Sequence, residues 1–237
     1  MSTMPTGNDA SEPGEDRAAF MQRVRASLGN TRTDAPDEPA PAIDQALVRL
    51  AGVDDDLLAM FRERAIGTGM HVHRVDQPEA TAKVCEVIRD ARAHRIGVAA
   101  GIIGQQLGLE AALRNAGLEV AEWRSAPGMD GQYDLDAGIT DVHAALAETG
   151  TIVLCSGARH SRGLSLAPHT HLALVRSSDV IPDMIDYWQR LKGIPNTELP
   201  SSQVFVTGPS KTADIEGELI TGVHGPGNVH IVLIEDM

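Results

Sequence analysis

The chain has 237 residues, of which 42% are hydrophobic and only 3% aromatic, and its formal net charge is −13. These values fit one globular domain with an appendage and an aliphatic core, and the acidic charge argues against a nucleic acid partner. The longest uncharged apolar run, 96–103, is too short to span a bilayer, and no signal-peptide pattern opens the chain. We therefore expect a cytoplasmic protein without a membrane span.

The sequence pattern of the first 42 residues predicts an arm that is separate from the domain that follows. Phe20, Val24 and Leu28 recur every four residues, which predicts an amphipathic helix over 17–28. The proline-rich stretch 30–42 is typical of a linker. A helix this short is unstable alone, so it must dock on its own domain, a second copy or another protein.

Residues 43–237 alternate between strand-like and helix-like apolar patterns, and we interpret this region as one domain. We predict strands over 71–75, 95–99, 118–123, 151–155, 171–175, 203–207 and 228–234. We predict helices over 43–68 with a break near Gly52, and over 79–94, 104–117, 140–149, 182–192 and 213–220. Strands that alternate with helices indicate an α/β fold with a mainly parallel sheet flanked by helices.

The stretch Gly208-Pro-Ser-Lys-Thr-Ala-Asp-Ile-Glu216 is the first candidate site. It joins a predicted strand to a predicted helix, and a helix start offers backbone N–H groups to an anion. Lys211 adds a positive charge there, whereas Asp214 already complements the helix dipole. The alternative is that the Gly and Pro residues only shape a turn. His224, in Gly222-Val-His-Gly-Pro226, either donates to a ligand or bonds to backbone.

The run Ala147-Glu-Thr-Gly-Thr151 is the second candidate. Glu148 falls at the end of a predicted helix, where its charge opposes the macrodipole. Either it is solvated at the surface, or it points into a cleft as an acid/base or ligand anchor.

A third candidate is the loop that contains Arg162 and His169. No Asp or Glu occurs in 149–178, so this part of an acidic chain is positive and suits a small anion. A long loop is also polar without any function. The pair His169 and His171 lacks a positioned third ligand, and we predict no metal site.

Two further sequence patterns give only weak evidence for a functional site. The loop Gly101-Ile-Ile-Gly104 is similar to a phosphate-binding turn but lacks the G-x-G-x-x-G spacing. Cys85 and Cys155 form no CxxC pair, so neither a disulfide framework nor an iron–sulfur site is indicated in this chain.

Several of these stretches occur together in a set order. They are Gly138-Ile-Thr140, Ala147–Thr151, Arg162 with Ser165-Leu-Ala-Pro168, Gly208–Glu216 and Gly222–Pro226. Their combination resembles the LUD domain family of lactate utilisation protein C, over roughly residues 17–237. Lys211 stands where that family often has Arg, which keeps the charge but not the forked geometry.

The resemblance implies a fold like those of sugar-phosphate isomerases, CoA transferases and 5-formyltetrahydrofolate cyclo-ligase. It also implies a role in oxidising L-lactate to pyruvate, as one subunit of a three-protein complex whose iron–sulfur clusters lie on the other subunits. We therefore expect no cofactor in this chain, and a small carboxylate as its ligand.

The resemblance carries no catalytic residues over, so we choose candidates by their chemistry. The catalytic candidates are Glu148 and His224. The ligand-binding candidates are Thr149, Gly150, Thr151, Arg162, Ser165, His169, Gly208, Pro209, Ser210, Lys211, Thr212, Asp214 and Gly225.

Two other functions remain open at this point. One is a stand-alone enzyme of the same fold that acts on a phosphorylated, CoA-linked or folate substrate, with Glu148 as nucleophile or base. The other is a scaffold or regulator without a ligand of its own.

Overall fold

The computed structural model describes residues 16–28, 44–52, 54–99, 101–121, 130–157, 160, 162–195, 197–213 and 219–237. The chain divides into two compact units, Met1–Leu47 and Val48–Met237. In the first unit, α1 (Arg17–Ser27) forms the predicted helix, and the Asp16 side chain caps it by accepting the Ala18 N–H. None of the α1 residues is buried. The short helix α2 (Gln45–Val48) runs across the boundary between the units.

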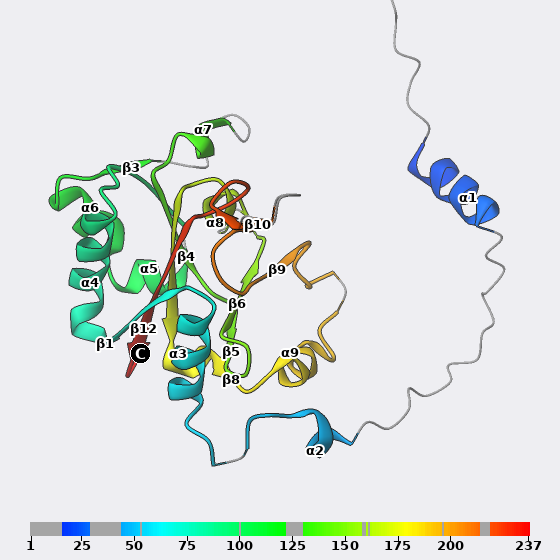
Figure 1. Ribbon diagram of the computed structural model, residues 1–237. Helices are drawn as coiled ribbons and strands as arrows, with labels where there is room; N and C mark the ends of the chain where they lie inside the picture. The colour runs from blue at the N-terminus through cyan, green and yellow to red at the C-terminus, as the bar shows by residue number, and fades with distance from the viewer. Residues whose placement is uncertain are drawn as a thin grey trace, which may run out of the picture. The chain divides into compact units, whose positions relative to one another are not determined.

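The second unit is built on a six-stranded sheet in the order β1–β12–β7–β4–β2–β3 (Figure 1). Its strands are β1 (His71–Asp76), β2 (Arg95–Val98), β3 (Glu119–Ala121), β4 (Ala137–Asp141), β7 (Thr170–Arg176) and β12 (Asn228–Glu235). Every neighbouring pair runs parallel. The predicted mainly parallel sheet is therefore confirmed.

Three helices cover one face of this sheet, and Figure 1 shows α4 and α6 side by side there. They are α4 (Gln77–Asp90), α5 (Ile102–Gln106) and α6 (Leu109–Asn115). Their aliphatic side chains, such as Ile88 and Leu113, share one buried core with Ile139 and Leu172 of the sheet. Aliphatic side chains thus build this helix–sheet interface despite the low aromatic content.

The other face is covered by α3 (Leu57–Gly67) and a second sheet of four strands, ordered β8–β5–β6–β9. These strands are β5 (Ala144–Leu146), β6 (Thr151–Cys155), β8 (Val180–Ile181) and β9 (Gln203–Val206). Phe61 and Ile152 pack there against Ala173 and Ile231. On the far side of the second sheet, α9 (Met184–Leu191) inserts the buried Tyr187.

Two predicted helices are wrong. Residues 140–149 form the end of β4 and all of β5, because Ala137–Asp141 is buried on both faces between β2 and β7. Both ends of the predicted helix 213–220 are strands, since β10 (Lys211–Ala213) pairs antiparallel with β11 (Leu219–Thr221). The middle of that segment, with Asp214, lies outside the described residues.

Two other helices are divided. The stretch 104–117 becomes α5 and α6, separated at Gly108, whose φ of +58° interrupts a right-handed helix. The predicted helix over 43–68 is limited to α2 and α3, so the break near Gly52 is wider than the sequence suggested.

Candidate functional site

A polar pocket lies where the carboxyl ends of β4 and β6 meet. Its lining comes from both sheets, from the loop that follows β6 and from the helix after that loop: Thr140, Asp141, Leu154, Cys155, His160, Arg162 and Ser165. The carboxyl ends of parallel strands are the usual place for ligands in open α/β sheets. We call this cluster the polar pocket.

Asp141 is the acidic group of the polar pocket. Its Oδ2 accepts the Ile103 N–H at 2.8 Å and its Oδ1 accepts the Gly104 N–H at 3.4 Å, both at the start of α5. A Cβ on Gly101 would lie 2.1 Å from Oδ2, so only glycine fits beside the carboxylate. Burial raises the pKa of the Asp141 carboxyl, and the two hydrogen bonds oppose that shift. The group is thereby suited to exchanging a proton with a ligand.

Thr140 presents a fixed hydroxyl beside Asp141. Its Oγ1 lies 2.9 Å from Nε2 of His171, and both side chains are buried. Burial lowers the pKa of His171 to about 4, so the imidazole is neutral at physiological pH. The neutral ring and the hydroxyl therefore share one hydrogen bond, which orients the hydroxyl.

The cationic side of the pocket is held by α8 (Gly163–Leu166). Arg162 precedes α8 and is exposed, and Ser165 Oγ donates to the Arg162 carbonyl oxygen at 3.0 Å. The helix lies directly on β4, since a Cβ on Gly138 would come within 1.8 Å of the Leu164 carbonyl oxygen. Gly138 thus lets Arg162 and Ser165 approach the end of β4.

These groups suit a small hydroxy acid. Arg162 can bind a carboxylate in a forked geometry, while Asp141 can accept a hydrogen bond from a hydroxyl group. The enclosed space is about 10 Å³, roughly one water molecule. A three-carbon acid is larger than this space. It therefore binds only if the exposed Arg162 side chain first moves outward to admit it and then closes over it.

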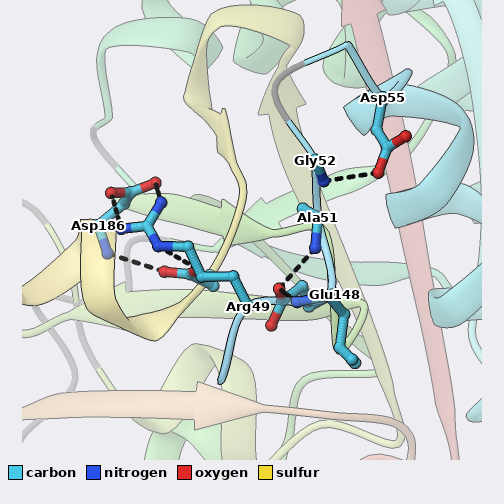
Figure 2. A network of polar contacts seen from close by, with 8 residues as sticks. Arg49, Ala51, Gly52, Asp55, Glu148 and Asp186 are labelled. Atoms are coloured by element: carbon cyan, nitrogen blue, oxygen red, sulfur yellow. Dashed lines mark hydrogen bonds and ion pairs between the residues drawn. The ribbon is translucent and has the colours of Figure 1, made fainter. Parts of the chain in front are cut away.

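Glu148 lies elsewhere, in what we call the Glu148 clamp (Figure 2). Its Oε1 accepts the backbone N–H groups of Leu50 and Ala51, the latter at 2.8 Å. Beside it, the Arg49 guanidinium donates to both carboxylate oxygens of Asp186, at 2.8 and 3.1 Å. These contacts fasten the segment before α3 to the turn after β5 and to α9. Glu148 does not line the polar pocket.

The residues after Glu148 pack against α3. Gly150 has a φ of +64°, and a Cβ on it would lie 2.2 Å from the Ala65 nitrogen. The hydroxyls of Thr149 and Thr151 are 2.7 Å apart, and that of Thr151 is 2.7 Å from Thr207. This run therefore joins the second sheet to a helix.

The Gly208–Lys211 turn meets the carboxyl end of α3. A Cβ on Gly208 would lie 2.8 Å from the Thr68 carbonyl oxygen, and Lys211 Nζ donates to that same oxygen at 3.0 Å. The lysine charge thus complements the negative end of a helix dipole. Pro209 lies against Gly69, and Thr212 belongs to β10.

The remaining candidates lie before the amino ends of the parallel strands. Ser210 N–H donates to the Pro226 carbonyl oxygen at 2.9 Å, which ties it to the glycine-rich turn. His169, His224 and Gly225 line a separate hollow there. The structure thus brings only Arg162 and Ser165 into the polar pocket, and distributes the other described candidates over the clamp, the α3 contacts and this hollow.

Sequence reasoning did not choose Asp141 or Thr140 as site residues, and it considered His171 only as half of a metal-ligand pair. The signal was present: an acid directly follows the short apolar run of β4, at the carboxyl end of a strand. Assigning residues 140–149 to a helix concealed it.

The fold and the pocket define an α/β protein with a polar site at the carboxyl edge of a parallel sheet. Residues 58–234 match the model of the LUD domain family, and the chain belongs to that family. A protein of the DUF162 family from Deinococcus radiodurans shares the fold, with a TM-score of 0.57 at 22% sequence identity. The match covers 75% of this chain and 96% of that one.

Curated relatives align over nearly the whole chain. Lactate utilization protein C of an Exiguobacterium species is 31% identical over 229 residues, which cover 94% of this chain and 97% of that protein. Lactate utilization protein C of Halalkalibacterium halodurans is also 31% identical, with 93% and 98% covered. The protein of the same name from Bacillus subtilis is 28% identical, with 94% and 97% covered.

Two further findings concern only the described residues. None of their helices combines the length and the apolar character needed to cross a bilayer. Nor do their His, Cys, Asp and Glu side chains form a group of three or more that is placed to hold a metal ion.

Proposed function

We propose that this chain acts in lactate utilisation, as the LUD-domain subunit of an iron–sulfur complex that oxidises L-lactate, and that it binds a small carboxylate. The observation that carries this proposal is the nearly end-to-end alignment with lactate utilization protein C of several bacteria. The chemistry of the polar pocket supports it, because a cation, hydroxyls and a protonatable carboxyl lie together.

In this proposal Arg162 binds the ligand carboxylate, and the hydroxyl oxygens of Ser165 and Thr140 lie beside the ligand, with the Ser165 hydrogen already donated to the Arg162 carbonyl oxygen. Asp141 accepts a hydrogen bond from the ligand hydroxyl and can take up its proton. We place the iron–sulfur clusters on partner subunits, since a cluster usually needs four thiolates and this chain has two cysteines. Of these, Cys85 is buried in the α4 core, and burial raises the pKa of the Cys155 thiol.

The N-terminal arm is the proposed contact with those partners. Phe20 and Leu28 of its apolar stripe are 47% and 70% exposed. We expect a chain that lacks residues 1–40 to unfold as cooperatively as the full chain but to lose co-purification with its partners. Unfolding of the truncated chain under native conditions would instead make the helix part of the core.

The test of function is made on the purified full chain. We expect L-lactate or pyruvate to bind, as measured by calorimetry, without lactate oxidation by the isolated chain. Arg162→Ala should weaken binding and impair growth on lactate. Turnover by the isolated, cluster-free chain contradicts the subunit proposal, and unchanged lactate growth with Arg162→Ala contradicts the site.

A stand-alone enzyme that acts on a phosphorylated substrate is the second candidate. One contact disfavours it: the backbone N–H groups at the start of α5, which could otherwise bind a phosphate, already donate to the Asp141 carboxyl group. Thermal shifts with ATP, CoA and sugar phosphates, without a response to lactate or pyruvate, would favour this second candidate.

A further inference from the structure

A second, larger hollow lies at the amino edge of the parallel sheet. The neighbouring strands β4, β7 and β12 begin there in register, since Thr170 pairs with both Ala137 and Asn228. Asp136 and His169 stand directly before β4 and β7. Together with α7 (Asp130–Tyr133), the end of α8 and the Gly222–Gly225 turn, they enclose about 690 Å³. We call this space the amino-edge hollow. It is in the size range of small-molecule sites.

Asp136 gives the hollow a fixed negative charge. Its Oδ2 accepts the N–H groups of Arg95 and His94, at 2.9 and 2.8 Å. The hydrogen bond from Arg95, with that from His94, lowers the pKa of the Asp136 carboxyl, so the group stays ionised. Within the described part of the chain, Oδ1 accepts no hydrogen bond. One carboxylate oxygen is thus anchored, and the other retains its full acceptor capacity.

Planar rings and aliphatic side chains form much of the remaining lining. The Tyr133 ring is 67% exposed, and the imidazoles of His169 and His224 are exposed as well. Leu166 and Val223 add apolar surface, at 43% and 52% exposure. Exposed rings beside aliphatic groups offer stacking surfaces for a flat ligand.

The glycine-rich turn packs against one of these rings. A Cβ on Gly227 would lie 2.8 Å from Cε1 of His169, so a side chain there would displace the imidazole. Gly222, with a φ of +84°, lies against the same ring. The turn thus closes one wall of the hollow around His169.

We propose that the amino-edge hollow binds a planar nitrogen heterocycle that carries an amino group, such as an aminopurine or a pterin. The rings and aliphatic groups take its faces, and Asp136 accepts hydrogen bonds from its N–H groups. A small carboxylate is disfavoured there because it would meet the ionised Asp136. This site lies at the opposite edge of the sheet from the polar pocket and is independent of lactate binding.

The test titrates the full chain with adenosine, guanosine and neopterin, by saturation-transfer NMR and calorimetry. We expect at least one of these probes to bind saturably. Asp136→Asn should weaken that binding at least tenfold. The matched control is Asp134→Asn, because Asp134 is 69% exposed, pairs only loosely with Arg95 at 3.6 Å and lies outside the lining. It should bind the probe as the parent chain does.

Asp136 also holds the start of β2, so thermal unfolding of both variants is recorded. If Asp136→Asn fails to fold, His224→Ala decides, because this exposed ring can be removed without disturbing the core. We expect His224→Ala to weaken binding several-fold.

The inference is overturned if none of the three probes binds at millimolar concentration. It is also overturned if a probe binds to Asp136→Asn and to His224→Ala as tightly as to the parent chain. If only one of these variants folds, the binding by that variant decides. Arg162→Ala separates the two proposals, since it should impair lactate binding and leave heterocycle binding unchanged.

Discussion

Asp141 in the polar pocket and Glu148 in the clamp both accept hydrogen bonds from two consecutive backbone N–H groups. Their surroundings differ. Asp141 is 8% exposed and shares its pocket with Arg162 and His160, whereas Glu148 is partly exposed and holds a connecting segment beside Arg49. The comparison teaches that similar hydrogen bonds do not decide the role of a carboxylate: burial and the neighbouring groups suit Asp141 to a ligand, whereas Glu148 holds a connecting segment.

The largest expected effect concerns two histidines of the parallel sheet: His171 in β7, beside Thr140, and His230 in β12, which stacks on His71 of β1. The pKa of His171 and of His230 is lowered to about 4, from an ordinary value of 6.5. The unfolded chain therefore binds more protons below pH 6.5, so stability falls as the pH drops from 6.5 to 4. Between pH 7.5 and 5 we expect a loss of about 2 kcal/mol for each imidazole.

Urea unfolding at the two pH values measures this loss. His230→Gln should reduce it by about 2 kcal/mol. The raised pKa of Asp141 acts in the opposite direction, because its folded form keeps a proton longer as the pH rises. An unchanged pH profile in His230→Gln would contradict the assignment of the loss to these imidazoles.

The next effect concerns the contact that supports Arg162. Gly138→Ala places a Cβ 1.8 Å from a backbone oxygen of α8, which cannot move without shifting the helix. We expect a loss of about 3 kcal/mol in the free energy of unfolding, measured with urea. Gly67→Ala in α3 is the control, since a Cβ there meets nothing within 4 Å, and it should be neutral or stabilising.

A smaller effect separates the clamp from the pocket. Glu148→Ala leaves the N–H groups of Leu50 and Ala51 without their acceptor, so we expect a loss of about 1–3 kcal/mol in stability. Glu148→Gln keeps an acceptor oxygen and should lose less. Neither variant should change lactate affinity. A loss of lactate binding at full stability would return Glu148 to the catalytic candidates.

The smallest expected effect concerns Lys211. Lys211→Met keeps the aliphatic stem but removes the charge at the end of α3, and should reduce the free energy of unfolding by about 0.5–1 kcal/mol. The same urea experiment measures it. If this variant instead abolished lactate binding at full stability, the lysine would belong to an anion site.

The sequence predicted the parts that depend on long periodic segments. The buried strands β6, β7 and β12 and the helix α4 all follow from their apolar patterns. It did not predict the second sheet, because β5 and β8 are only three and two residues long and have no period of their own. Their strand conformation is set by pairing, β5 with β6 and β8 with β5, and by packing on the main sheet.

The candidate site was predicted only in part. Arg162 and Ser165 were found from charge and motif, and both lie in the polar pocket. Glu148 and Lys211 were interpreted as ligand groups from their places in turns, but such residues equally bind backbone groups of distant segments. The tertiary fold determines which distant segment packs against a given turn. The local sequence pattern therefore cannot predict that contact.

The central claim is that the polar pocket holds the small carboxylate. The most direct measurement is the affinity for L-lactate of three folded proteins: the parent chain, Arg162→Ala and Glu148→Ala. We predict that Arg162→Ala weakens binding by at least about tenfold, since it removes a charge-assisted pair, and that Glu148→Ala binds as the parent does. Normal binding by Arg162→Ala, with binding lost in Glu148→Ala, would contradict the account.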